Sequence, residues 1–152
     1  MSDCEICPLL VGQTPEDPQV VLQTERWVVV LDKDQEYLGK AFVTLRKHKN
    51  TISDLNATDW AELYEVIKRI EHAMKHAFSP DVFNWSCLMN NAVAAGQSTH
   101  VHWHLQPRYL GGTMFAGEEF PDPIWPRRVE KLTKLVSDDV FMQITNAVRK
   151  NL

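Results

Sequence analysis

The stretch that decides the fold reads His100-Val101-His102-Trp103-His104-Leu105, with a histidine at every second position. Successive side chains of an extended strand point to opposite faces, so the histidines share one face and the apolar residues share the other. A helix would spread residues two apart around its circumference, so the pattern predicts a strand with one buried face and one histidine face. Three aligned imidazoles are suited to holding a ligand or moving protons; the alternative is a solvated face without a function.

Length and composition predict one soluble globular domain over residues 1–152, long enough to bury a substantial core. The formal net charge of −4 argues against a general nucleic-acid binder, which needs a basic surface. A small anionic ligand needs only a few local donors and stays compatible with this charge. No apolar run approaches the roughly 20 residues of a membrane span, and the first residues lack a secretory signal pattern. We therefore expect a cytoplasmic protein without a membrane partner.

The remaining patterns predict an α+β fold. Polar or glycine-containing turns separate short apolar runs, which we expect to form strands at 20–22, 27–31, 41–45, 82–89 and 101–105. Asn56 and Asp59 are placed to cap a long helix, and Ser137 is placed to open a short C-terminal helix. Pro107 is expected to interrupt strand pairing, and the glycines and prolines of 111–123 indicate a long irregular connection.

The long helix carries one apolar stripe at helical spacing, which we interpret as core. The stripe consists of Trp60, Leu63, Tyr64, Ile67, Ile70, Met74 and Phe78. His72 and His76 lie four residues apart but off this stripe, and are expected to be solvated rather than to hold a metal.

Cys4 and Cys7 form a Cys-x2-Cys pair, which can hold one zinc ion when two further ligands come from elsewhere in the chain. An incidental pair and a redox pair are the alternatives, although no thioredoxin-like pattern surrounds it. With Cys87 the count is odd, which suits reduced thiols better than disulfides. His48 follows the strand expected at 41–45 and, without the cysteines, would be interpreted as an ordinary surface histidine.

The segment 90–99, just before the histidines, consists mainly of small residues, amides and hydroxyls. Such a loop can bring backbone amides close to a phosphate, and Ser98 or Thr99 can add a hydroxyl donor. The segment lacks the Gly-Lys-Ser/Thr ending of a Walker loop, and the alternative is a plain turn between two strands.

Taken together, these residues resemble the histidine triad (HIT) family of nucleotide hydrolases and transferases. The histidine strand with the following Pro107-Arg108 and the preceding 95–98 carries the resemblance, and the strands, the long helix and His48 fall in the family's order. The resemblance implies an antiparallel sheet, one long helix, a short C-terminal helix, and a homodimer that joins two sheets. It also implies hydrolysis or transfer at the α-phosphate of a nucleoside phosphate, of the dinucleoside polyphosphate or nucleoside phosphoramidate type.

The resemblance also implies residue roles. His102 would attack phosphorus through one ring nitrogen while the other donates to a backbone carbonyl, and His104 would hold the non-bridging oxygens. Asp32 would accept hydrogen bonds from the ribose hydroxyls. The remaining substrate-binding residues by resemblance are Asn90, Gly96, Gln97 and Ser98, of which the Gly96 amide and Ser98 would assist as charge develops.

In some bacterial members similar to this chain, two cysteines and two histidines provide four ligands, which here fall on Cys4, Cys7, His48 and His100. This set implies a closed structural zinc site and no catalytic metal. The chain departs from many members at Lys40, where they carry a histidine, and has only two residues between Gln97 and His100, where three are usual.

Two other functions stay open. In one, the histidines and cysteines form a metal-storage or metalloenzyme site, which predicts loss of function with a chelator. In the other, the domain binds nucleotides without turnover, which predicts tight binding and no modification of His102.

Overall fold

The computed structural model describes residues 3–127 and 132–152. In chain order its elements are α1 (Ile6–Val11), β1 (Val20–Gln23), β2 (Trp27–Leu31), β3 (Ala41–Leu45), the 3-10 helix η1 (Ile52–Asp54), α2 (Ala57–Phe78), β4 (Val82–Ser86), α3 (Asn90–Ala94), β5 (His102–Arg108), β6 (Thr113–Phe115), β7 (Glu118–Phe120) and α4 (Asp138–Lys150).

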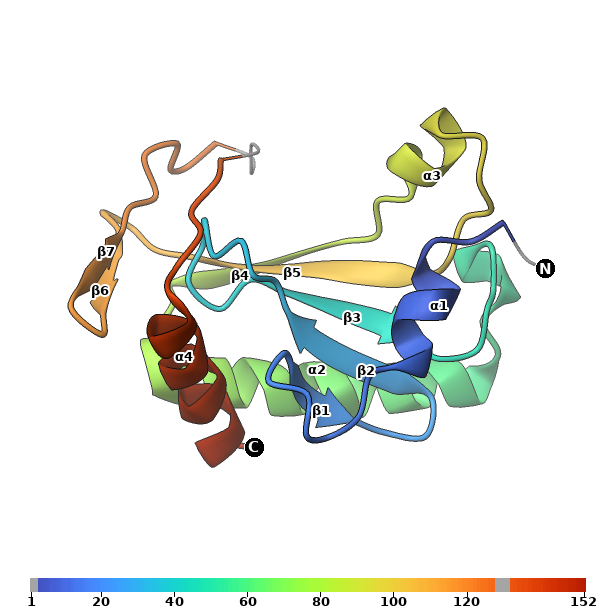
Figure 1. The fold of residues 1–152 in the computed structure, drawn as a ribbon, viewed down its shortest axis with the longest axis horizontal. Helices are drawn as coiled ribbons and strands as arrows, with labels where there is room; N and C mark the ends of the chain where they lie inside the picture. Colours follow the sequence, from blue (N-terminus) through green and yellow to red (C-terminus); the bar gives the residue numbers. More distant parts are fainter. Residues whose placement is uncertain (1–2, 128–131) are drawn as a thin grey trace.

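The main sheet has the strand order β1-β2-β3-β5-β4, and every neighbouring pair is antiparallel. Figure 1 shows α2 running beneath one face of this sheet, with α4 beside the C-terminal end of α2. The α1 helix and the segment that carries α3 stand at the other end, on the opposite side of the sheet from α2. The expected α+β class, with an antiparallel sheet, a long helix and a C-terminal helix, is confirmed.

The core lies between the sheet and α2, where alternate residues of the strands face the helix. Trp27, Val43 and Leu105 are fully buried there, as are Ile70 and Met74 of α2. The predicted helix stripe is correct at Leu63, Ile70, Met74 and Phe78, but Trp60 and Tyr64 are 41% and 60% exposed. Val66 and Ala73 are buried in the helix stripe instead. The buried stripe is thus rotated away from the two aromatic residues of the first turns.

The N-terminus of α2 is fixed by the expected cap. Asn56 accepts from the Asp59 amide, and Asp59 accepts from the Asn56 amide, which forms a reciprocal capping box. The buried Asp59 carboxylate also forms salt bridges with Arg26 and Lys49. Burial raises the pKa of Asp59, but the hydrogen bonds from Lys49, the Asn56 backbone and Arg26 outweigh it and lower the pKa to about 2. The carboxylate therefore stays ionised and keeps the helix start attached to the sheet.

Several boundaries differ from the sequence predictions. β4 ends at Ser86 rather than at residue 89, and β5 continues through Pro107 to Arg108. Proline is accommodated because β5 pairs with β3 only up to Leu105, so beyond it a strand lies on one side alone. The segment expected to be irregular contains the β6–β7 hairpin, whose turn includes Gly117 at φ +80°. Over residues 3–127 and 132–152, no helix combines the length and the apolar character that crossing a bilayer requires.

Candidate functional site

Strand β5 places His102 and His104 on the face of the sheet opposite α2. His102 pairs with Thr44 of β3, and His104 pairs with Phe42, so these four side chains share one face. The His102 and His104 rings lie 5.1 Å apart, and Phe42 contacts the His104 ring edge-on at 5.0 Å between centroids. For His102 and His104 the alternation therefore does what the sequence predicts, because it presents both imidazoles away from the core. His100, the third histidine, lies before β5 and is buried.

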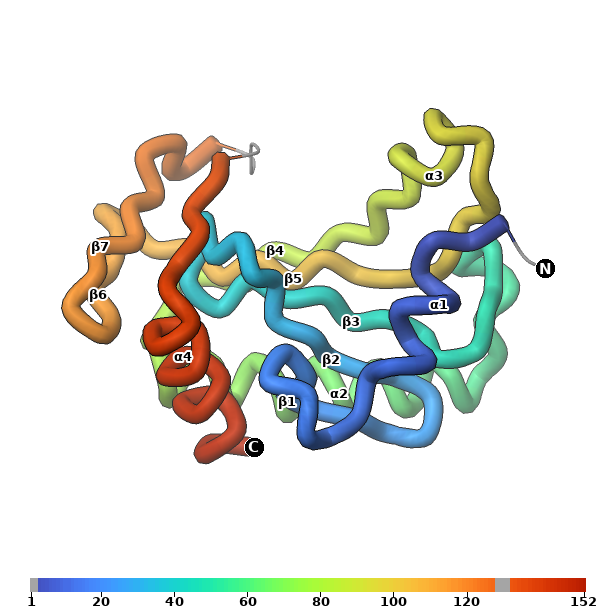
Figure 2. Tube along the Cα trace, in the orientation of Figure 1, coloured from blue at the N-terminus to red at the C-terminus, as the bar shows by residue number. Residues whose placement is uncertain are grey.

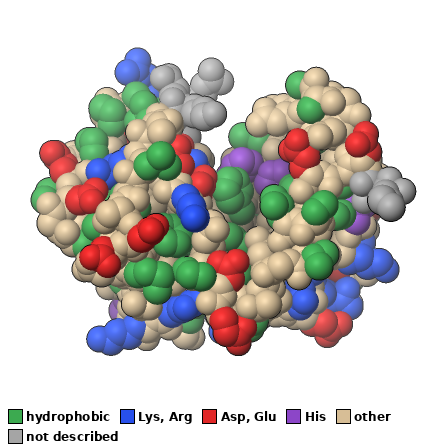
Figure 3. Space-filling view, in the orientation of Figure 1, with side chains coloured by type: hydrophobic (Ala, Val, Ile, Leu, Met, Phe, Trp, Pro, Cys, Tyr) green, Lys and Arg blue, Asp and Glu red, His purple; other side chains and the backbone are tan. Residues whose placement is uncertain are grey.

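This face forms the floor of a cavity of about 650 Å³. Its walls come from α1 on one side and from the segment around α3 on the other. Histidine side chains are visible in Figure 3 at the bottom of a hollow between the α3 lobe and the lobe that carries β6 and β7. A cavity of this size suits a ligand as large as a nucleotide. Of the residues predicted to act, it is lined by Asp32, Gln97, Ser98, His102 and His104.

His102 has a fixed tautomer. Its Nδ1 lies 2.8 Å from the backbone oxygen of His100, and a carbonyl can only accept, so Nδ1 carries the proton and donates. The hydrogen bond is the one that the resemblance implies. It leaves the lone pair of Nε2 on a ring that faces the cavity, which is the state that a nucleophile requires.

The pKa of His104 lies below the usual value of a histidine. Burial lowers its pKa, His102 and Lys40 lower it further, and a hydrogen bond with the Leu88 backbone and the charge of Asp32 oppose the shift. Its Nε2 is buried and has no hydrogen-bond partner among the described residues. His104 lines the cavity, so a ligand group that reaches this nitrogen would supply the missing hydrogen bond.

Asp32 stands just past the end of β2 and also lines the cavity. Its Oδ1 accepts from the Asp34 amide at 3.0 Å, and its Oδ2 lies 2.8 Å from the Lys40 ammonium. A carboxylate has about four acceptor positions, so Asp32 retains capacity for further donors such as sugar hydroxyls.

The loop between β4 and β5 is only partly as expected. Asn90 is the first residue of α3 rather than part of a loop, and it does not line the cavity; Asn91 and Ala92 do. The Gly96 amide already donates to Val93 at 3.1 Å, so it is not free to stabilise a substrate oxygen. Five residues of the supposed loop thus fold into a helical turn, and the Gly96 amide would have to leave Val93 to bind a substrate oxygen. The substrate-binding roles of Asn90 and Gly96 stay predictions.

Gln97 and Ser98 connect the loop to the N-terminal segment. Gln97 donates to the Glu5 carboxylate at 2.9 Å, and the Ser98 amide donates to the Asp3 carbonyl at 3.0 Å. Figure 2 shows the two segments side by side although they are far apart in sequence. The two walls of the cavity are therefore hydrogen-bonded to one another at one end.

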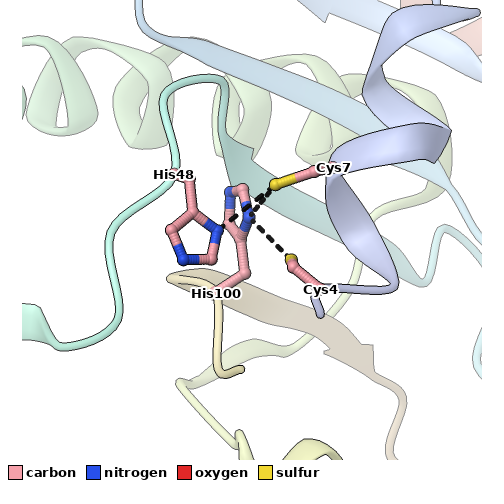
Figure 4. Close-up of side chains that lie close together, drawn as sticks. All are labelled: Cys4, Cys7, His48 and His100. Carbon is pink, nitrogen blue, oxygen red and sulfur yellow. Dashed lines mark hydrogen bonds between the residues drawn. The ribbon is translucent and has the colours of Figure 1, made fainter. Parts of the chain in front are cut away.

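The four predicted metal ligands meet beside the cavity. Cys4 lies just before α1 and Cys7 lies in its first turn, while His48 comes from the loop after β3 and His100 from the residues before β5 (Figure 4). Their ligand atoms all lie within 4.8 Å of one another. The Nδ1 atom of His100 is 3.5 Å from Cys4 Sγ and 3.6 Å from Cys7 Sγ, and that of His48 is 3.2 Å from Cys7 Sγ.

This arrangement fits zinc. A tetrahedron with Zn–S of about 2.3 Å and Zn–N of about 2.0–2.1 Å has S–N edges of about 3.5 Å, close to the spacing seen. The nitrogens that point away from the cluster have acceptors, as a metal-binding histidine requires. Nε2 of His100 donates to the Leu45 carbonyl at 2.6 Å, and Nε2 of His48 donates to Asn50 Oδ1 at 2.9 Å. Both histidines thus present a bare Nδ1 inward, as metal-binding imidazoles do.

The apolar wall that α1 supplies was not predicted from the sequence. Ile6, Leu9 and Leu10 of this helix line the cavity, and none of its residues is fully buried. A six-residue helix with an internal proline has too few turns to produce a recognisable hydrophobic period. The only available signal was the cluster of apolar residues that follows the two cysteines.

The fold and the histidine strand define an α+β protein with a triad site on the open face of its sheet. The family model of the HIT domain matches residues 13–111, and the chain belongs to the HIT family. An uncharacterized HIT-like protein of Methanocaldococcus jannaschii is 27% identical over 110 residues, which cover 71% of this chain and 81% of that protein. Family membership supports a nucleotide-binding or hydrolase-type function.

Solved structures share the fold. A Zn-bound histidine triad family protein from Mycobacterium smegmatis aligns with a TM-score of 0.61 and 21% identity, covering 97% of this chain and 94% of that one. The Plasmodium falciparum diadenosine triphosphate hydrolase, in complex with Cyclomarin A, aligns with a TM-score of 0.59 and 16% identity, covering 91% and 79%.

Proposed function

We propose that this protein is a hydrolase or nucleotidyl transferase that acts at the α-phosphate of a nucleoside phosphate through a nucleotidyl-His102 intermediate. The observation that carries the proposal is the His102 ring, whose Nδ1 is fixed as a donor and whose face opens on a nucleotide-sized cavity. The fold shared with a diadenosine triphosphate hydrolase supports the dinucleoside polyphosphate class, and nucleoside phosphoramidates are the second class.

In the first step His102 Nε2 attacks the α-phosphorus, a P–N bond forms, and the bond from phosphorus to the leaving group breaks. His104 lies beside His102, and its Nε2 has no partner among the described residues. The negative charge of a bound phosphoryl group favours a proton on this nitrogen, which then donates to a non-bridging oxygen as charge develops, while the leaving group takes up a proton from solvent water. In the second step water attacks phosphorus, the P–N bond breaks, and a nucleoside monophosphate leaves. When an alcohol or phosphate acceptor replaces water, the same steps give transfer.

The test is a substrate panel of adenosine phosphoramidate, diadenosine triphosphate and diadenosine tetraphosphate, with AMP formation followed by chromatography. We expect AMP as a product from at least one member, at a rate that far exceeds the rate without protein. Binding of AMP without turnover of any panel member would favour the non-catalytic nucleotide-binding module. Activity that appears only with added metal and ends with chelator would favour a metalloenzyme.

We propose that zinc binds Cys4, Cys7, His48 and His100 as a structural ion. The inward Nδ1 atoms and the S–N spacing support this proposal, and so does the Zn-bound relative of the same fold. Bound there, zinc would supply a crosslink between the start of α1 and the two loops that flank β3 and β5. No chemical step is assigned to it. The reduced cysteines of such a site suit the cytoplasm, which fractionation of the native cells would test.

We propose in addition that the protein is a homodimer that joins two sheets. β4 is an outer strand of the sheet, and the exposed Trp60 and Tyr64 lie on α2, on the helix that covers that sheet. Outer strands and exposed aromatic residues are each typical of an interface. Tyr64→Glu is expected to shift the sedimentation coefficient to that of a monomer, whereas Met142→Glu on α4 should not. A monomeric wild-type protein at micromolar concentration would contradict this proposal.

A further inference from the structure

Lys40 occupies an unusual position between two carboxylates beside the cavity. Its ammonium lies 2.8 Å from Asp32 Oδ2 and 3.1 Å from Glu36 Oε1, and the Lys40 side chain is 12% exposed. The Glu36 side chain is only 3% exposed. Removing such charges from water is costly, so an ion cluster of this kind contributes little net stability. Its value lies in what it holds in place.

The group it holds is the Asp32 carboxylate. The Asp34 amide binds Oδ1 and the Lys40 ammonium binds Oδ2, so both oxygens have one donor within the protein. These two bonds fix the rotation of the carboxylate and use about two of its four acceptor positions. Because Asp32 lines the cavity, the fixed carboxylate is an acceptor on each oxygen for a ligand with two neighbouring hydroxyls.

The backbone around this pair is equally constrained. The fully buried Gln35 side chain donates to the carbonyls of Asp32 at 2.5 Å and Lys40 at 2.9 Å. The Asp32 amide donates to the Lys40 carbonyl at 3.0 Å, so both ends of the turn are joined. Lys40 can therefore set the position of the carboxylate without moving the strands.

Lys40 itself does not line the cavity, and two carboxylates already receive its ammonium. Direct contact with a ligand phosphate would require it to leave them. The geometry favours an action through Asp32.

We propose that Lys40 is a positioning residue that fixes Asp32 for a vicinal diol and thereby makes the site selective for ribonucleotides over 2′-deoxyribonucleotides. The inference rests on the proposed nucleotide-binding function and adds to it a specificity and a residue. A 2′-deoxyribose leaves one oriented acceptor without its donor, which weakens binding by about tenfold or more. Without Lys40 the carboxylate rotates to bond water or a single hydroxyl, so the preference disappears.

The test measures binding of AMP, 2′-deoxy-AMP and adenosine by calorimetry. We expect the wild-type protein to bind AMP about tenfold more tightly than 2′-deoxy-AMP, and Lys40→Met to reduce this ratio below about threefold. Lys40→Arg keeps a donor for both carboxylates and should restore most of the ratio. Asp32→Asn should lose the preference, and adding Lys40→Met to it should change the ratio no further, since Lys40 acts through Asp32.

Lys40→Met leaves Glu36 buried without its cation, so Glu36→Gln/Lys40→Met is measured beside it as the variant that removes both charges. The same loss of ribose preference is expected from both. An unchanged ratio in the folded variants overturns the inference. The inference is also overturned if Lys40→Met weakens the binding of AMP and of 2′-deoxy-AMP equally and leaves the affinity for adenosine unchanged. That pattern would mean that Lys40 contacts the phosphate. If the wild-type protein binds no nucleotide, the proposed function fails; binding without ribose preference overturns only the role of Lys40.

Discussion

Replacing His102 by alanine is expected to lower kcat/KM for the best member of the substrate panel by about 10⁴-fold or more. His102 is the residue whose free ring nitrogen faces the cavity, and the reaction has no other route through a covalent intermediate. The ring is at the surface of the cavity rather than in the core, so its removal leaves the packing between the sheet and α2 intact. Binding of AMP should therefore change far less than turnover.

The matched control is His72→Ala. His72 lies on the exposed face of α2, with the neighbouring His76 donating to its backbone oxygen, and neither residue lines the cavity. The structure confirms that both are exposed, as expected from the sequence. Activity of His72→Ala should match the wild type. A His102→Ala protein that keeps more than about a tenth of wild-type turnover would show that another group is the nucleophile.

Removing the proposed zinc is expected to have the second large effect, on stability. Zinc present at about 1,000 times its dissociation constant adds about 4 kcal/mol to the free energy of unfolding, which corresponds to roughly 8–16 °C in Tm for a chain of this size. Chelation or Cys7→Ser should remove most of this gain. The loss should concentrate in α1, because this helix has only six residues, buries none of them, and has no side-chain cap.

Three measurements check the zinc prediction: metal content, thermal unfolding and amide exchange over residues 4–11. Cys87→Ser is the control, since Cys87 lies outside the cluster and a serine hydroxyl can replace its thiol beside the His102 backbone. Because Ile6, Leu9 and Leu10 line the cavity, faster exchange in α1 should accompany weaker AMP binding. A Cys7→Ser protein with full zinc content and an unchanged Tm would contradict the structural assignment.

The parts of the fold that the sequence could predict are those with a strong local signal. The histidine alternation specified β5 and its two faces, and the reciprocal Asn56–Asp59 pair specified the start of α2. The same alternation could place His102 beside His104, but only the fold brings Cys4 and Cys7 to His48 and His100. Cys4 and His100 are more than 90 residues apart in the chain. The resemblance to a family, rather than any local pattern, predicted that these ligands meet.

The parts that could not be predicted are short elements whose position depends on tertiary contacts. α1 and α3 have six and five residues, which is too little for a helical period, and both depend on neighbouring segments. The exposure of Trp60 and Tyr64 was also missed, because spacing defines a stripe without fixing where the sheet meets it. The salt bridges of Lys40 with Asp32 and Glu36 depend on the turn between β2 and β3. A turn has no repeating sequence pattern, so these salt bridges could not be predicted.

The most direct test of the central claim is the mass of the intact protein after brief incubation with adenosine phosphoramidate or diadenosine tetraphosphate and a rapid quench under conditions that preserve P–N bonds. The account predicts a wild-type species heavier by one nucleotidyl group, with the modification mapped to His102 and absent from His102→Ala. A wild-type protein that turns over substrate while its mass stays unchanged under every quench time, or an adduct that persists in His102→Ala, would contradict the nucleotidyl-His102 intermediate.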